Sequence, residues 1–385
     1  MNNYSIENSD NSLTQLLERV KADAERQVDF TAPTTDLQLQ TEDNKSTVVI
    51  EANRGLPTML LETNDVAFDQ IAQRIDVPAK HARRLRENYP AELDGLVRAI
   101  WDKEPERRMV RTYMDSDLER SQRFGVPANG IARAFVSDKF KTFDNKHLLE
   151  AALPQLIESP AQWQVVSGNV TDKRLYLQLK SQVIVGQPAV GDLMAHGIRF
   201  SNSEVGHGSI SVEQLAFTLW CLNGCTAGKS FRKAHLGRAM SDADDFAKIL
   251  KQDTIAAQNE ALRLTLRDLI GEYASRESFD EAIDKFGNAH QKTIDPSVSP
   301  QVVVERLGGV LKLSQMETSN VLDGLMKTIQ QQGYAGKKIS QATLVNAVTA
   351  VQHVVEPDDA GYWQKTGAKV LDLPANQWEI IKEAA

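Results

Sequence analysis

The sequence has little of what disulfide-bonded, secreted or membrane-spanning proteins need. Its 385 residues include two cysteines, Cys221 and Cys225, which excludes a disulfide framework and indicates a reducing compartment. No run of about 18 uncharged apolar residues occurs, so no membrane span is expected. The N-terminal string MNNYSIENSDNS has neither the basic start nor the apolar run of a secretory signal. These absences predict a cytoplasmic protein.

Common catalytic and nucleotide-binding motifs are also missing. The string CTAGKS (225–230) is similar to the end of a phosphate-binding loop, but three residues separate Gly224 from Gly228 where that loop requires four. Neither G-x-G-x-x-G nor a Ser-His-Asp order occurs. Without a second pair of cysteines, Cys221 and Cys225 favour apolar packing over a zinc site. We therefore expect no cofactor and no metal, and the sequence leans against an enzyme.

Charge is abundant and unevenly distributed. The chain has 52 Asp and Glu against 44 Lys and Arg, a formal net charge of −8. Hydrophobic residues make up 41% of it, which is enough for a large core in a chain of this length. An excess of Asp and Glu lies within residues 241–290, so the positive charge elsewhere is locally concentrated.

Periodicity divides the chain into three parts. Residues 1–45 are interpreted as an arm, with an amphipathic helix over 13–29 and a flexible connector. Residues 46–240 mix strand and helix patterns without a repeated βαβ period. This predicts an α+β core, a mainly antiparallel sheet with helices packed on it. Residues 241–385 show helical patterns and an acidic balance, which predict a helical C-terminal domain.

The segment Phe68–Leu85 fits a helix-turn-helix. In that interpretation Arg83, Arg84 and Arg86 face outward, where a recognition helix meets phosphates or base edges. Asp76 stands where this motif usually has glycine. Many helix pairs joined by a short turn with proline give the same pattern, so a packed pair with a solvated basic face stays open as the alternative.

Basic and aromatic residues gather in the predicted strands and in GKSFRKAHLGR (228–238), which we expect in a loop or at a helix start. Concentrated cations attract a polyanion, and aromatic rings can stack on its bases. A half-exposed sheet neutralised by the acidic helices has the same composition and stays an alternative. The candidate phosphate contacts are Arg111, Arg133, Lys139, Lys141, Arg174, Lys229, Arg232 and Lys233. The candidate stacking residues are Phe140, Phe143 and Phe231.

The string NSEVGHGS (202–209) has two glycines around a histidine and is typical of a tight polar turn between strands. Glu204 and His207 also lie close enough in sequence to form an acid–base pair or half of a metal site. With His235 they define an alternative function, a metal-assisted nuclease.

Four strings taken in order resemble one family. They are RAFVSDKFKTFDN (133–145), GIRFSNSEVGHGSISV (197–212), LWCLNGC (219–225) and RKAHLGR (232–238). Together with the upstream Arg111 they resemble the phage- and plasmid-encoded proteins grouped as domain of unknown function 932, over residues 50–240. The resemblance implies a mobile element and, by association with replication and recombination genes, a nucleic-acid role. It implies no biochemical activity.

The leading hypothesis is a nucleic-acid-binding protein that acts in DNA recombination, annealing or protection without catalysing a reaction. Single-stranded DNA is the expected ligand and a homo-oligomer the expected assembly. Besides the nuclease, an interaction protein that inhibits a host factor is an alternative, since acidic C-terminal helices could mimic DNA. The hypothesis requires the cations to share one surface and not to be held against carboxylates.

Overall fold

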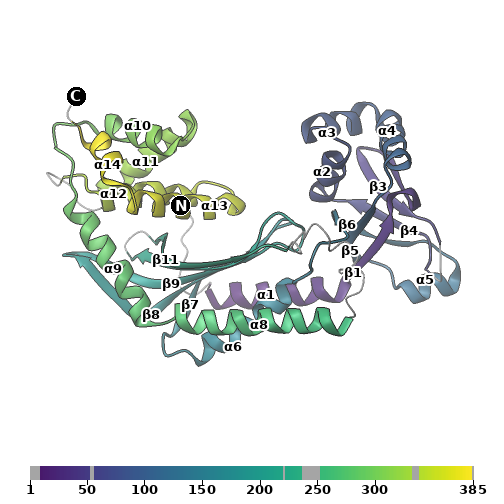
Figure 1. Ribbon diagram of the computed structural model, residues 1–385, viewed down its shortest axis with the longest axis horizontal. Helices are drawn as coiled ribbons and strands as arrows, with labels where there is room; N and C mark the ends of the chain where they lie inside the picture. The colour runs from purple at the N-terminus through teal and green to yellow at the C-terminus, as the bar shows by residue number, and fades with distance from the viewer. Residues whose placement is uncertain (1–8, 53–55, 220–221, 236–251, 332–337, 384–385) are drawn as a thin grey trace.

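The computed structural model describes residues 9–52, 56–219, 222–235, 252–331 and 338–383. Two mostly antiparallel sheets and the helices around them form an elongated molecule (Figure 1). Helices dominate the C-terminal part, so the predicted α+β class is confirmed. None of the helices in the described ranges is long and apolar enough to cross a membrane.

Sheet 1 is built from the N-terminal part of the chain. Its strands are β1 (Gln27–Pro33), β2 (Leu37–Glu42), β3 (Lys45–Ile50), β4 (Met59–Thr63), β5 (Arg107–Met114) and β6 (Ala128–Ser137). They lie in the order β1-β5-β6-β4-β3-β2. The neighbours β4 and β6 are parallel, and all other neighbours are antiparallel.

The flexible connector predicted within residues 1–45 is wrong, because this part of the chain forms β1 and β2. In β2, Leu37 and Leu39 are buried while Gln38 and Gln40 are exposed. This alternation matches the two-residue period of a strand with one buried face. The spacing of the two leucines is typical of a strand, although most of the residues around them are polar.

Helices cover one side of sheet 1. They are α2 (Asp65–Arg74), α3 (Ala79–Asn88) and α4 (Pro90–Lys103). A short helix, α5 (Leu118–Phe124), connects β5 to β6. Phe68 and Ile71 of α2 and Val97 and Trp101 of α4 are buried in one core with the sheet. The side chain of Asn64 caps α2 by accepting a hydrogen bond from the Ala67 amide.

Sheet 2 is an antiparallel meander. Its strands are β7 (Trp163–Val170), β8 (Leu175–Ala189), β9 (Asp192–Asn202), β10 (Ile210–Thr218) and β11 (Asn223–Lys233), in the order β11-β10-β9-β8-β7. The basic residues 229–233 therefore lie on an edge strand, and the predicted loop or helix start is wrong. Gly228, with φ of 102°, and a register shift opposite it in β10 let β11 continue past this point.

Helices pack on both faces of sheet 2 (Figure 1). One face carries α1 (Ser9–Arg26), α6 (Asn145–Glu158) and α8 (Gln252–Tyr273). The other packs against C-terminal helices, from α9 (Arg276–Gln291), α10 (Pro300–Leu311), α11 (Gln315–Gln331), α12 (Gln341–Ala350), α13 (Pro357–Leu371) and α14 (Ala375–Lys382). The helical C-terminal part thus shares a core with sheet 2.

Candidate nucleic-acid interface

Arg111 of β5 lies where sheet 1 meets sheet 2, and it is fully buried. Its Nη2 donates to Asp144 Oδ1 at 2.6 Å, its Nε donates to Asp29 at 3.1 Å, and its Nη1 donates to the Glu204 carbonyl at 2.7 Å. Burial by itself would lower the pKa of the guanidinium, but the carboxylates of Asp144 and Asp29 outweigh burial and raise it. Arg111 is a charged, fully occupied link between the sheets and cannot contact a phosphate.

Arg133 of β6 lies in the same junction with 4% of its surface exposed. It forms an ion pair with Glu204, and its Nη1 also donates to the Tyr113 hydroxyl at 3.0 Å. Glu204 uses its other oxygen to accept from the amide of Asn145 at 2.6 Å, at the start of α6. The second predicted phosphate contact is therefore also a buried structural arginine.

Three of the four strings quoted from the sequence meet at this junction. The Asn202 amide group donates to the Phe143 carbonyl at 2.8 Å and to Asn145 Oδ1 at 3.0 Å. Asn202 Oδ1 lies 3.0 Å from His235 Nε2, and His235 Nδ1 lies 3.0 Å from the Lys141 carbonyl. Burial is the main cause that lowers the pKa of His235. Segments 133–145, 202–205 and 232–235 thus hold one another in place.

The predicted stacking residues are core residues. Phe143 is 2% exposed, and Phe140 is 7% exposed with its ring stacked on His235 at a centroid distance of 5.1 Å. Phe231 is half-buried and packs against the core shared by sheet 2 and α8. Base stacking on Phe140 and Phe143 is therefore wrong, because burial leaves their rings no open face of the kind that stacking needs.

The remaining candidate cations are exposed but differently engaged. Lys229 pairs with Glu272 of α8 at 2.7 Å. Lys139 and Lys141 are exposed on the segment between β6 and α6, and the Lys141 amide donates to the His235 carbonyl at 2.7 Å. Arg232 and Lys233 are neighbours in β11, so their side chains point to opposite faces of the sheet. These cations do not form one continuous surface.

Two arginines from separate segments of the chain bond to the same turn. Arg174, just before β8, donates from Nε to the His207 carbonyl at 2.8 Å, and Arg232 of β11 donates from Nε to Ser209 Oγ at 3.3 Å. Arg174 also lies over Gly208, where an added Cβ would overlap its guanidinium. The two side chains therefore flank the turn between β9 and β10 from either side.

We call the residues Lys173, Arg174, His207 and Arg232 the turn surface. Within the described ranges, no carboxylate forms an ion pair with Lys173, Arg174 or Arg232. Partial burial, followed by the charges of Lys173 and Arg174, lowers the pKa of His207. At neutral pH the charge of this surface therefore comes from two arginines and one lysine.

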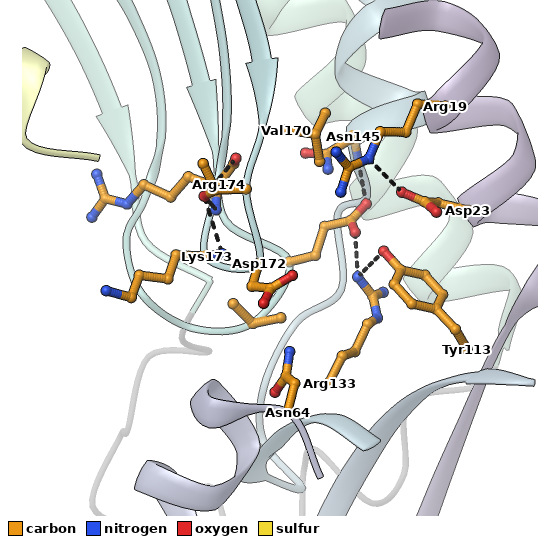
Figure 2. Close-up of a pocket in the computed structure, with 13 residues that line it drawn as sticks. Arg19, Asp23, Asn64, Tyr113, Arg133, Asn145, Val170, Asp172, Lys173 and Arg174 are labelled. Atoms are coloured by element: carbon orange, nitrogen blue, oxygen red, sulfur yellow. Dashed lines mark hydrogen bonds and ion pairs between the residues drawn. The ribbon is translucent and has the colours of Figure 1, made fainter. Parts of the chain in front are cut away.

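A small polar cavity separates the turn surface from the junction (Figure 2). Lys173 and Arg174 lie on one side of it, Arg19 and Asp23 of α1 on another, and Arg133 below. Its volume is about 30 Å³, room for roughly two water molecules. A nucleobase does not fit inside it, so any nucleic-acid contact here has to be made from the outside.

The residues of the nuclease alternative do not form a metal site. Both carboxylate oxygens of Glu204 accept hydrogen bonds within the junction, and both ring nitrogens of His235 face oxygen atoms there. His207 is exposed on the turn. Among the residues that the structure describes, no group of three or more His, Cys, Asp and Glu side chains could hold a metal ion.

No family model matches this chain, and no curated protein or solved structure is significantly similar to it. The resemblance to domain of unknown function 932 therefore stays a prediction.

The sequence interpretation missed the carboxylates that hold the two buried arginines. Asp29 falls at the end of the helix predicted over 13–29, and Asp144 falls in the string 133–145, so neither is predicted to pair with an arginine. A usable signal was present, because Arg111 and Arg133 each lie in a strand among apolar or small neighbours. An arginine in such a strand requires a buried acidic partner.

Proposed function

We propose that the protein binds single-stranded DNA through its phosphates, without catalysing a reaction, along the turn surface. The observation that carries this proposal is that Arg174 and Arg232 bond to one turn, each through its Nε atom, and neither forms an ion pair with a carboxylate in the described chain. A guanidinium already held in place loses less side-chain entropy when it binds a phosphate. Of the predicted phosphate contacts the proposal retains Arg174 and Arg232, and it abandons base stacking.

The position of the turn favours a single strand over a duplex. Gln70 of α2 donates to the Val205 carbonyl at 2.7 Å, and Asp358 of α13 accepts from the Thr171 hydroxyl at 2.9 Å, so helices of both parts of the molecule reach the segments beside the turn. Figure 1 shows α13 on the sheet 2 side and α2 on the sheet 1 side of the place where the two sheets approach each other. A flexible single strand can follow a strip bordered in this way, whereas a duplex is wider and stiffer.

The test compares two double variants of the full chain. In Arg174→Gln/Arg232→Gln both anchored guanidinium groups are lost. The matched control, Lys229→Gln/Lys285→Gln, removes the same charge from lysines that already pair with Glu272 and Asp372. Binding to a fluorescent oligothymidine is measured by anisotropy over a range of salt concentrations.

We expect the arginine variant to lose roughly 25-fold in affinity near about 0.1 M salt, because each phosphate contact contributes a factor of about 5 there. The slope of log affinity against log salt should become shallower by about 1.4. The control should bind as the wild type does. Equal affinities and slopes for the two variants would refute the turn surface as the binding site.

The proposal extends to the biological setting. The resemblance to domain of unknown function 932 supports a role in DNA recombination, annealing or protection in the cytoplasm, for a phage or other mobile element. Three of the four strings that carry the resemblance, 133–145, 197–212 and 232–238, supply residues of the junction that holds the turn between β9 and β10. Two of them also supply His207 and Arg232 of the turn surface itself.

Self-association is part of the proposal and is supported by the far end of the β8–β9 hairpin. Strand β7 pairs with β8 only as far as Ser181. Beyond it, Val183, Val185 and Leu193 are 45%, 38% and 48% exposed. An apolar strand segment with an open edge is suited to pairing with another copy. Light scattering of the wild type should give a molecular mass that is a multiple of 42.8 kDa. Val185→Lys should lower this mass, and the control Val354→Lys, at another exposed valine, should leave it unchanged.

A further inference from the structure

The helix pair α2–α3 has the turn geometry that its sequence left in doubt. Asp76 has a φ of 53°, the left-handed conformation for which glycine is usual at this point. The Asp76 amide donates to the Gln73 carbonyl at 3.2 Å, and the Val77 amide donates to the Ala72 carbonyl at 3.0 Å. Aspartate is among the few residues that tolerate this conformation. The chain therefore forms the tight turn of a helix-turn-helix without glycine.

Two ion pairs clamp α3 onto α2. Arg83 donates to Asp69, and Arg86 lies 3.4 Å from Asp65 with its guanidinium 4.2 Å from the centre of the Phe68 ring. The inner side of α3 also carries Ala82, which is fully buried. Two of the arginines that the sequence assigned to an outward face thus serve to fix the position of this helix.

The outer side of α3 carries cations that no carboxylate of the described chain holds in an ion pair. Lys80, His81 and Arg84 are exposed at positions i, i+1 and i+4, and so share one helix face. Within the described part of the chain, no carboxylate forms an ion pair with Lys80 or Arg84. No acidic residue occurs in the first turn of α3. Figure 1 shows α3 at the outer end of the sheet 1 unit, beyond α2 and away from sheet 2.

We propose that this face of α3, defined by Lys80, His81 and Arg84, binds duplex DNA by lying along its major groove. A helix fixed by a tight turn, with cations on its first two turns, has the arrangement by which recognition helices contact base edges and phosphates. The positive face complements the phosphate backbone, and the clamp by Arg83 and Arg86 fixes the helix in advance. This site is separate from the turn surface and does not depend on it.

The test measures binding of the full chain to a fluorescent duplex by anisotropy. The variant Lys80→Ala/Arg84→Ala should bind roughly 60-fold more weakly near about 0.1 M salt, because each lost contact to duplex DNA removes a factor of about 8 there. Its salt slope should become shallower by about 1.8. The control Arg98→Ala/Lys382→Ala removes two charges from exposed cations that pair with Asp102 and Glu379 on their own helices, and should bind as the wild type does.

Two further measurements keep this proposal independent of variant folding and of the turn surface. On the wild-type chain, duplex DNA should protect Lys80 from chemical acetylation and leave Lys369 of α13 reactive. The variant Arg174→Gln/Arg232→Gln should lose single-strand affinity while its duplex affinity stays within about twofold of the wild type. No duplex binding by the wild type, or no protection of Lys80, would overturn the assignment of α3.

Discussion

The junction and the turn surface use the same residue type in opposite ways. Arg111 and Arg133 lie in strands of sheet 1, buried, and each is held by at least one carboxylate. Arg174 and Arg232 lie on sheet 2, bond through Nε to the turn, and have no ion-pair partner in the described ranges. The comparison shows that an arginine in a basic cluster is available to a ligand only when no carboxylate is placed within reach of it.

The largest difference between the two regions should appear in stability. Arg111→Met removes a fully buried guanidinium from the exposed Asp29 and the half-buried Asp144, which we expect to lower the free energy of unfolding by about 3 kcal/mol. Arg174→Met at the turn surface should change it by less than about 0.5 kcal/mol. Urea denaturation of both variants measures the two values. Similar losses of unfolding free energy in the two variants would show that Arg111 and Arg174 do not differ in their structural role.

A smaller effect should appear in the pH dependence of stability. Burial alone would raise the pKa of Asp144, but Arg111 holds it below its ordinary value of 3.8. A carboxyl with a lowered pKa stabilises the folded state above its unfolded pKa and loses this contribution as pH falls through the folded pKa. Each unit by which the folded state lowers the pKa contributes about 1.4 kcal/mol to the free energy of unfolding.

The matched variant is Asp144→Asn, since asparagine also caps a helix. The wild type should be more stable than this variant at pH 6, and the gap should close as the pH falls below about 4. Denaturation at a series of pH values measures the gap. A gap that is the same at pH 6 and pH 3 would show that the charge of Asp144 contributes nothing.

Gly208→Ala should separate a loss of binding from a loss of stability. The new Cβ would displace the Arg174 guanidinium, which is a flexible group. The free energy of unfolding should therefore change by less than about 1 kcal/mol. Single-strand affinity should still fall about fivefold, the contribution of one phosphate contact near about 0.1 M salt. Gly95→Ala is the control, because nothing lies within 4 Å of the added Cβ there. Unchanged binding by Gly208→Ala would remove Arg174 from the site.

Much of the architecture was accessible from local pattern. The caps, helices and most strands between residues 46 and 240 follow hydrophobic spacing, as does the helical C-terminal part. The two strands β1 and β2 were missed because their polar residues were given more weight than the alternation of Leu37 and Leu39. The edge strand β11 was missed because glycine and lysine are unusual in strands, and its pairing with β10 outweighs that preference.

The site was less accessible, because burial of an arginine depends on groups far away in the chain. Arg199 illustrates this point: it lies opposite Glu213 in the neighbouring strand, and Lys365 of α13 reaches the same carboxylate at 2.8 Å. Three charges from three separate segments satisfy one another inside the molecule. Charge counting along the sequence treats them as surface residues.

Composition and periodicity were sufficient for the class of fold and the concentration of positive charge, because both depend on residues near one another in the chain. The exposure of each cation was decided by tertiary contacts. Asp29, Asp144 and Glu204 come from three distant segments, and only folding brings them against Arg111 and Arg133. The physical reason is that an ion pair acts over a few ångströms of space, whatever the number of residues between its partners.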